Sequence, residues 1–364
     1  MTGRPLFVRG RGAVSAFGAG LPALCEGVFQ GACALRPPLR LAGIPDLPAA
    51  VGELPAGADG PEEALALGMS CRAGEEALAG WGARAATALV LCTAKAAQDG
   101  GRGEGPGRLA AAVAARLGLG GPRLAVSTAC ASGLSGLALA GRWLRAGRAA
   151  HALVLGVDAL TPFVARGFVG LLALDPGPCR PFDRARRGLS LGEGAGALLL
   201  SGEPGPGAPL RLLGWGEAND ANHVTGPRRD GGGLRLAAER ALARAGLAPD
   251  ALDTVHLHGT ATPYNDAAEA LALRDLCGGP TPPAWGSKAA LGHTLGASGV
   301  LETLLLGEAL LRGLTGPNLR LEEPDVDPAL RLVRGPTPLR RARVGLKVSA
   351  GFGGIDAAVL LGRD

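Results

Sequence analysis

The same order of predicted elements occurs twice along this chain of 364 residues. In the first half, a strand at residues 124–127 turns sharply into an apolar helix, and a Gly-rich run at 188–197 closes the half. In the second half, residues 284–287 turn into another apolar helix, and a Gly-rich hairpin at 344–361 closes it. Internal similarity of this kind is the signature of a repeated architecture, so we expect a duplicated fold.

Short β-rich runs alternate with longer Ala/Leu-rich helices, which predicts a layered α/β fold. The predicted strands cover residues 88–91, 124–127, 152–156, 195–200, 210–215, 254–257 and 344–348. The predicted helices cover residues 62–78, 107–117, 131–146, 233–245, 267–276 and 299–312. The Gly/Pro segment 201–209 is a predicted linker. We therefore expect an N-terminal half over residues 1–205 and a C-terminal half over residues 206–364.

The composition excludes several classes of protein. Apolar residues make up 47% and charged residues 19% of the chain, which is typical of a globular protein. Aromatic residues make up only 3%, so stacking platforms for nucleic acid are not expected. The net charge of +5 comes almost wholly from Arg, since three of the 37 basic residues are Lys. This charge favours acidic partners, and with so few aromatic residues we expect no nucleic-acid partner.

The sequence predicts a cytoplasmic protein without a membrane span. Arg4, Arg9 and Arg11 interrupt the apolar residues at the start, so we expect no signal peptide. The longest uncharged stretch, residues 124–141, contains several hydroxyl and Gly residues and fits a strand, a turn and a buried helix. The seven cysteines form no Cys-x-x-Cys pair, which favours reduced thiols and predicts no metal site.

Cys130 is the first candidate for chemistry. It lies where the predicted strand at 124–127 turns into a helix. The start of a helix, with its unpaired backbone N–H groups, favours the thiolate, which is the nucleophilic form of Cys. The alternative is a small buried apolar residue, which is our interpretation of the other six cysteines.

Two histidines stand at turns of the second half. His258 follows a predicted strand, and His293 lies in the turn equivalent to the Cys130 turn. A duplicated fold that brings its equivalent turns together would also bring Cys130 and His293 together. A lone His is more often structural, but two on such turns favour a catalytic interpretation. We interpret His151 and His256 as structural.

An ordered set of motifs resembles the β-ketoacyl-acyl carrier protein synthases. The set covers nearly the whole chain in family order, and it is specific although each motif alone would be weak. It has the Cys-His-His pattern of the elongating members. The motifs are Thr128-Ala129-Cys130-Ala131-Ser132-Gly133, Cys179-Arg180-Pro181-Phe182-Asp183-Arg184, Gly192-Glu193-Gly194-Ala195-Gly196, His258-Gly259-Thr260-Ala261-Thr262 with Asn265, Asp266 and Glu269, Ser287-Lys288 with Gly292-His293-Thr294-Leu295-Gly296, and Gly351-Phe352-Gly353-Gly354.

This resemblance implies the thiolase fold, an α/β fold in which two βαβαβαββ halves stack as five αβαβα layers. It implies a homodimer, or a heterodimer with a ketosynthase-like chain. The partner would be an acyl carrier protein, whose phosphopantetheine arm carries the substrates. No tightly bound cofactor and no metal are implied.

The resemblance also implies a role for each catalytic residue. Cys130 would take the acyl group as a thioester, with the backbone N–H groups of Cys130 and Phe352 as the oxyanion hole. His258 and His293 would bind the thioester carbonyl of a malonyl unit and stabilise the enolate that forms when CO₂ is lost. The carbanion would then attack the acyl-Cys.

Four further residues would support this chemistry. Lys288, paired with Glu302, would place positive charge near His293. A buried Lys–Glu pair with a purely structural role is the alternative. Thr260 and Thr262 would form hydrogen bonds with the pantetheine.

The chain departs from the family pattern at several positions. It is shorter than common elongating synthases over residues 39–122, so we expect an altered pocket or dimer geometry. Phe352 would gate the acyl pocket, with Ala350 where a second Phe is common and Asp356 where Asn is common. Lys95 stands where related synthases have an apolar residue at the pocket floor. It would either meet an acid across a dimer or point to solvent.

The leading hypothesis is an elongating ketosynthase that serves fatty acids or a specialised polyketide or polyene. The alternative is a ketosynthase-like interaction subunit of a heterodimer whose partner does the chemistry, and the presence of Cys130 argues against it. An α/β-hydrolase-like acyltransferase is disfavoured because the nucleophile turn lacks the Gly-x-Ser-x-Gly pattern.

Overall fold

A computed structural model describes residues 5–48, 50–55, 62–95, 105–205 and 209–364. The first half contains β1 (Leu6–Ser15), β2 (Gly18–Ala19), α1 (Leu21–Phe29), α2 (Glu62–Ala77), β3 (Thr87–Cys92), α3 (Pro106–Leu117), β4 (Arg123–Val126), α4 (Ser132–Arg145), β5 (His151–Asp158), α5 (Pro162–Gly170) and β6 (Gly194–Ser201). The second half contains β7 (Leu210–Asn219), α6 (Gly232–Ala245), β8 (Thr254–His256), α7 (Pro263–Cys277), β9 (Ala284–Trp285), α8 (Lys288–Leu291), α9 (Ser298–Arg312), β10 (Val344–Gly351) and β11 (Ile355–Arg363).

The two halves have the same strand order. The first reads β4-β3-β5-β6-β1, and the second reads β9-β8-β10-β11-β7. In each half the first three strands are parallel, and the last two are antiparallel to their neighbours. The repeat confirms the duplicated βαβαβαββ fold. The predicted boundary at residue 205 touches the segment 206–208, which lies outside the described residues, and it stays a prediction.

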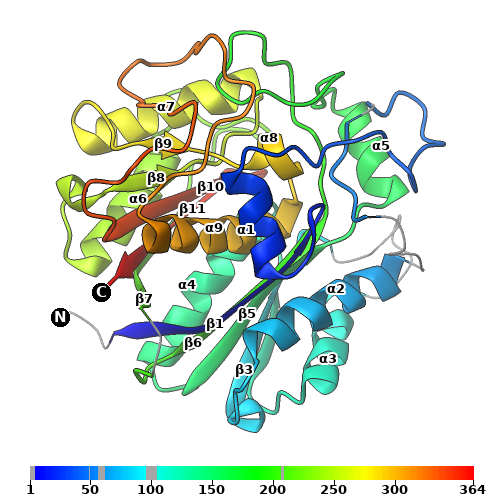
Figure 1. Cartoon of the computed structure of the whole chain (residues 1–364), viewed down its shortest axis with the longest axis vertical. Coiled ribbons are helices and arrows are strands. Elements are labelled where there is room, and N and C mark those ends of the chain that lie inside the picture. Colours follow the sequence, from blue (N-terminus) through cyan, green and yellow to red (C-terminus); the bar gives the residue numbers. More distant parts are fainter. Residues whose placement is uncertain (1–4, 49, 56–61, 96–104, 206–208) are drawn as a thin grey trace.

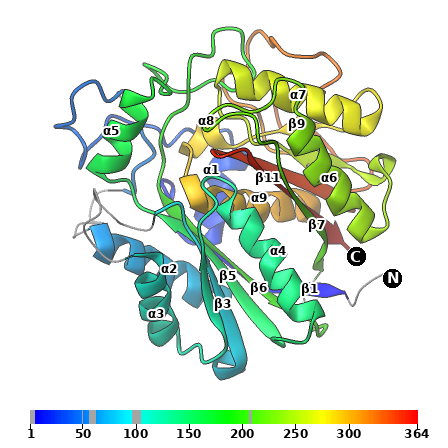
Figure 2. The same cartoon turned by 180° about the vertical axis from the view of Figure 1, so that it is seen from behind.

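The helices and sheets stack as five layers. The strands of the two halves form one continuous sheet, which is joined where β1 pairs with β7. The helices α4 and α9 lie between its two halves, since α4 contacts β5 and β11, and α9 contacts β6 and β10. The outer layers are α2 with α3 at one end of the molecule and α6 with α7 at the other (Figure 1; Figure 2). In the described part of the chain, no helix is both long and apolar enough to cross a membrane.

Every predicted helix and strand matches an observed element, and the largest shifts are at the end of β7, which runs on to Asn219, and at the start of α7, which begins at Pro263. Proline fits the first turn of a helix, so α7 starts earlier than the apolar pattern indicates. The pattern does not predict α1, α5 or β1. Strand β1 contains Gly10 and Gly12, which are unfavourable in a strand but are required here. A Cβ at Gly10 would lie 1.8 Å from the Ala77 carbonyl oxygen of α2.

The central helices α4 and α9 approach each other at two glycines. A Cβ at Gly133 would lie 2.7 Å from the backbone nitrogen of Val300 and 2.8 Å from the Cα of Gly299. The Cys130 turn leads into Gly133, and the His293 turn leads toward Gly299. The close approach of the two helices therefore brings the two equivalent turns together.

Gly133→Ala is expected to lower the free energy of unfolding by about 1–3 kcal/mol, because the added methyl group overpacks the contact between α4 and α9. Urea denaturation measures this change. Gly68→Ala in α2 is the matched control, since a Cβ there meets no atom within 4 Å. Equal effects of the two substitutions would contradict the close approach.

Candidate active site

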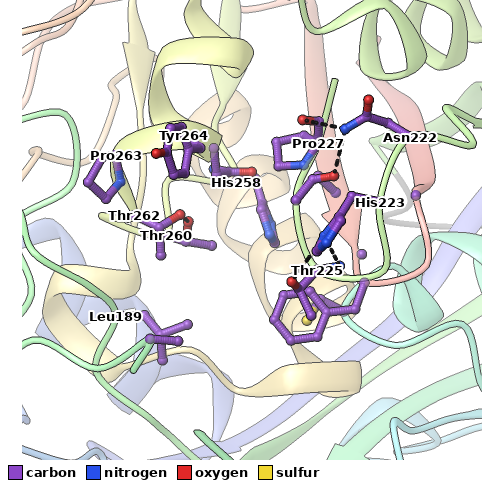
Figure 3. A pocket seen from close by; sticks show the side chains of 18 of the residues that line it. Leu189, Asn222, His223, Thr225, Pro227, His258, Thr260, Thr262, Pro263 and Tyr264 are labelled. Carbon is purple, nitrogen blue, oxygen red and sulfur yellow. Dashed lines mark hydrogen bonds between the residues drawn. The ribbon is translucent and has the colours of Figure 1, made fainter. Parts of the chain in front are cut away.

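One cavity of about 1080 Å³ collects the predicted site residues. Its wall contains Cys130, His258, Thr260, Thr262, His293 and Phe352. Figure 3 shows His258 between Thr260 and Thr262 on one side and the loop of His223 on the other. Lys288 and Glu302 are buried behind His258, which Lys288 contacts directly.

The two equivalent turns share a strained backbone. Ala129 lies directly before Cys130 with a φ of 50°, and Leu295 follows His293 with a φ of 50°. The left-handed conformation costs an L-residue about 1–2 kcal/mol. Residues held in this way cluster at functional sites, so the strain supports a functional interpretation of both turns.

Cys130 is only 7% exposed. Burial raises the pKa of its thiol to about 12, whereas the charge of Lys288 and the backbone N–H of Phe352 lower it. In the resting site desolvation thus outweighs the groups that favour the anion, and the reactivity of Cys130 stays a prediction. The N–H of Phe352 nevertheless donates to the sulfur, and its part in an oxyanion hole stays a prediction.

Charged side chains hold His258 on both sides of its backbone. The N–H groups of His258 and Gly259 donate to the two oxygens of Glu269, at 2.6 and 2.9 Å. The His258 carbonyl accepts a hydrogen bond of 2.6 Å from Lys288 Nζ, which also lies 3.4 Å from His258 Nδ1. A lysine ammonium only donates, so Nδ1 accepts and Nε2 carries the hydrogen. His258 therefore offers an N–H donor.

His293 is oriented by a hydroxyl that the sequence analysis missed. Its Nδ1 lies 3.0 Å from the Oγ of Ser298, which lies 3.0 Å from the Oγ1 of Thr294. The rings of His258 and His293 meet edge to face, with centroids 5.5 Å apart. Burial, with the charge of Lys288, lowers the pKa of His293 to about 3 and that of His258 well below its usual value. Both imidazoles are therefore neutral at pH 7.

The expected ion pair between Lys288 and Glu302 is present, with Nζ 2.6 Å from Oε1. The Nζ of Lys288 contacts His258, and its charge also reaches His293, whose pKa it lowers. A second lysine, Lys347, lies 2.6 Å from Oε2 of Glu302. Burial alone would raise the pKa of Glu302, but the two lysines lower it to about 2. The signal for Lys347 is its charge within the otherwise uncharged strand β10.

The departures at the closing motif also border the cavity. Phe352 stacks on Phe168 of α5, with ring centroids 6.0 Å apart, so a second Phe faces it although Ala350 is small. The sequence analysis missed Phe168. Asp356 lies beside Asp220, and burial together with this negative charge raises the pKa of Asp356 to about 8. Asp356 is therefore a neutral acid in the cavity wall at pH 7.

Lys95 is half-buried beside a buried carboxylate of its own chain. Its charge lowers the pKa of Asp158, which burial raises to about 6. Asp158 accepts hydrogen bonds from the N–H groups of Ala94 and Gly296, at 2.8 and 2.7 Å. Lys95 is not among the described residues of the cavity wall. The segments 56–61 and 96–104 of the shortened region lie outside the described residues.

Comparison with known proteins places the chain in a family. The Beta-ketoacyl synthase, N-terminal domain, matches residues 67–204, and the Beta-ketoacyl synthase, C-terminal domain, matches residues 211–322. Together the two matches cover more than half of the chain. The chain belongs to the β-ketoacyl synthase family.

Individual relatives agree with this assignment. The 3-oxoacyl-[acyl-carrier-protein] synthase 2 of Mycobacterium bovis is 37% identical over 195 residues, which are 52% of this chain and 47% of that protein. The chain thus spans about half the length of this curated relative.

Two solved β-ketoacyl synthase structures share the fold of this chain. A ketosynthase in complex with its chain length factor from Xenorhabdus doucetiae has a TM-score of 0.86 at 26% identity, over 99% of this chain and 98% of that one. The ishigamide ketosynthase/chain length factor has a TM-score of 0.90 at 26% identity, over 100% of both chains. These likenesses confirm the thiolase fold.

The labelling rate of Cys130 by iodoacetamide is expected to rise about tenfold per pH unit from pH 7 to pH 10, because only the thiolate reacts and the thiol pKa lies well above this range. Mass spectrometry of the peptides measures the rate. The fully buried Cys92 serves as an internal control for unfolding. A rate that levels off near pH 8 would show that the helix start outweighs burial.

Proposed function

We propose that this β-ketoacyl synthase is an elongating enzyme that condenses an acyl group with a malonyl unit, in fatty acid or specialised polyketide or polyene synthesis. The observation that carries the proposal is the meeting of Cys130, His258 and His293 at one cavity. A nucleophile and two neutral N–H donors in one site are the groups that this condensation requires.

In the first step, the sulfur of Cys130 attacks the carbonyl carbon of an acyl thioester on the phosphopantetheine arm of a carrier protein. The thiol gives up its proton, and the departing pantetheine sulfur takes one up, so one thioester replaces another. The backbone N–H groups of Cys130 and Phe352 hold the oxyanion. Thr260 and Thr262, whose hydroxyls lie 2.9 Å apart in the cavity wall, bind the arm.

In the second step, a malonyl thioester loses CO₂, and the electrons of the broken C–C bond form an enolate. The N–H groups of His258 and His293 stabilise the enolate oxygen. The enolate carbon then attacks the acyl carbonyl on Cys130, and the tetrahedral intermediate expels the Cys130 thiolate. The low pKa values of the two imidazoles keep both rings neutral at pH 7. A neutral imidazole still carries one N–H group that can donate a hydrogen bond to the enolate oxygen.

The proposal includes an acyl carrier protein as partner, no tightly bound cofactor, a cytoplasmic location and a dimer with a second copy or a ketosynthase-like chain. All seven cysteines are free thiols, which supports a reducing compartment. Strand β4 ends the strand order, and its Leu124 is 46% exposed. An edge strand with an exposed apolar side chain favours pairing with another chain. The similar structures are themselves described as ketosynthase with chain length factor.

Incubation with an acyl-carrier protein is expected to add the mass of one acyl group to Cys130, and Cys130→Ser is expected to abolish this product, because a hydroxyl is a far weaker nucleophile.

His258→Ala and His293→Ala are expected to slow decarboxylation of malonyl-carrier protein about hundredfold each, with a smaller effect on acylation. Intact-protein mass spectrometry follows acylation, and CO₂ release follows decarboxylation.

His223→Ala is the matched control for the two histidines, since His223 lines the same cavity from an exposed loop. It is expected to retain both steps. A wild-type chain that accepts no acyl group would support the interaction-subunit alternative instead. A histidine variant that loses acylation but keeps decarboxylation would contradict the assigned roles.

The cavity mouth offers positive charge to an acidic carrier protein. Arg187, Arg228 and Arg229 line the cavity and are exposed. Arg228 pairs with Asp230 at 2.5 Å, and the guanidinium of Arg229 lies 5.4 Å from the centroid of the Tyr264 ring. Three other arginines, at residues 180–187, are paired with acids, which supports a structural role for them: Arg180, Arg184 and Arg186.

Arg229→Glu is expected to slow acyl transfer from carrier protein at least about tenfold at low salt, because charge steers association, and to leave transfer from a small acyl thioester unchanged. Arg116→Glu on α3 is the control, since it makes the same charge change at an exposed site distant from the cavity. Equal loss with both substrates would reject a docking role.

A further inference from the structure

Glu302 lies between two buried ammonium groups. Its Oε1 is 2.6 Å from Lys288 Nζ, and its Oε2 is 2.6 Å from Lys347 Nζ. The side chains of Lys288, Lys347 and Glu302 are exposed by 1%, 0% and 2%. One carboxylate therefore serves two ammonium groups in a region without solvent.

The choice of lysine at these two positions is itself informative. The chain uses Lys only three times among 37 basic residues, and two of the three lysines meet at Glu302. An ammonium is compact and its pKa shifts readily on burial, whereas a guanidinium is larger and stays charged. Lysine therefore supplies a small cation at both positions, and its charge can change with pH.

The two lysines also hold consecutive carbonyls next to the cavity. Lys347 Nζ donates to the carbonyl of Leu257 at 2.9 Å, and Lys288 Nζ donates to the carbonyl of His258 at 2.6 Å. Lys347 stands on β10, and this strand runs on toward Phe352. Lys347 thus links β10, which leads to Phe352, to the segment that carries His258. It does so directly at the Leu257 carbonyl and also through Glu302, which it shares with Lys288.

We propose that Lys347 is a positioning residue, which holds the Leu257–His258 backbone and maintains an uncompensated positive charge behind His258 and His293. The consequence for catalysis rests on the proposed function, because the charge favours the enolate that would form at these histidines. Lys347 does not line the cavity and acts through its neighbours.

The buried charged groups around Lys347 have a positive net charge, which supports its role as a positioning residue. Two ammonium groups and the ionised Glu302 leave a net charge of +1. Glu269 is the other nearby acid, and burial raises its pKa to about 7, so at pH 7 it is about half ionised and reduces this net charge without cancelling it. His256 is neutral, since burial lowers its pKa to about 3. The charge of Lys347 contributes to the low pKa of both cavity histidines, so its field reaches both rings.

The first experiment separates charge from packing. Lys347→Met keeps the length of the side chain and removes its charge, and it is expected to slow decarboxylation of malonyl-carrier protein about tenfold with acylation of Cys130 within about twofold of wild type. The double variant with Glu302→Gln returns the net charge to +1 through Lys288 alone. It is expected to recover the decarboxylation rate to within about threefold of wild type. A double variant no faster than Lys347→Met would overturn the proposal.

Arg84→Met is the control for this experiment. Arg84 pairs with Glu75 at 2.7 Å, and the two side chains are 32% and 50% exposed, so its removal makes the same charge change at the surface. It is expected to leave both steps unchanged. A slowdown equal to that of Lys347→Met would also overturn the proposal.

The second experiment needs no catalysis. Burial lowers the pKa of Lys347 from 10.5 to about 8, despite the opposing charge of Glu302. Between these pH values the unfolded chain keeps a proton that the folded lysine has lost, so the free energy of unfolding gains a contribution that rises with pH. Urea unfolding from pH 8 to pH 10.5 is expected to show this rise in wild type relative to Lys347→Met.

The two experiments fail in different ways. If the wild-type chain decarboxylates no malonyl-carrier protein, the proposed function is wrong, but the unfolding experiment still tests Lys347. Parallel pH curves for wild type and Lys347→Met would overturn the assignment of a buried, titrating lysine, whatever the activity.

Discussion

The contact between α4 and α9 at Gly133 and Gly299 determines where the chemistry lies. Two helix backbones approach this closely only where neither carries a side chain, and each helix continues the turn that carries a candidate residue. Because the halves are duplicated, the contact joins equivalent positions. The duplication has become asymmetric in chemistry, with a thiol at one turn and an imidazole at the other.

The wall behind the cavity is charged although the protein surrounds it. A buried ion costs several kcal/mol unless it is paired and its hydrogen-bonding capacity is met. Here Lys288, Lys347 and Glu302 pair with one another, and both ammonium groups also donate to backbone carbonyls. The network does not reach the cavity itself. Its effect there is on the histidines, whose neutral forms it favours.

The sequence predicted the fold and the main candidates because their signals are local. Strand ends, Gly-rich turns and apolar helices mark the positions of Cys130, His258 and His293 before any packing is known. Ser298 and Phe168 have no such signal, since they matter through contacts with residues on other turns. The pKa of Cys130 is also non-local, because the number of groups that exclude water around the thiol depends on the packed fold and not on the turn.

At rest the cavity wall carries little charge where the reaction would create it. The thiol of Cys130, both imidazoles and Asp356 are neutral at pH 7, whereas the charge behind the wall is positive. The two histidines nevertheless differ. Lys288 only donates, so it fixes the hydrogen of His258 on Nε2, but the hydroxyl of Ser298 both donates and accepts. The tautomer of His258 is therefore fixed by a group that can only donate, whereas the N–H that His293 offers to an enolate requires the Ser298 hydroxyl to donate to Nδ1.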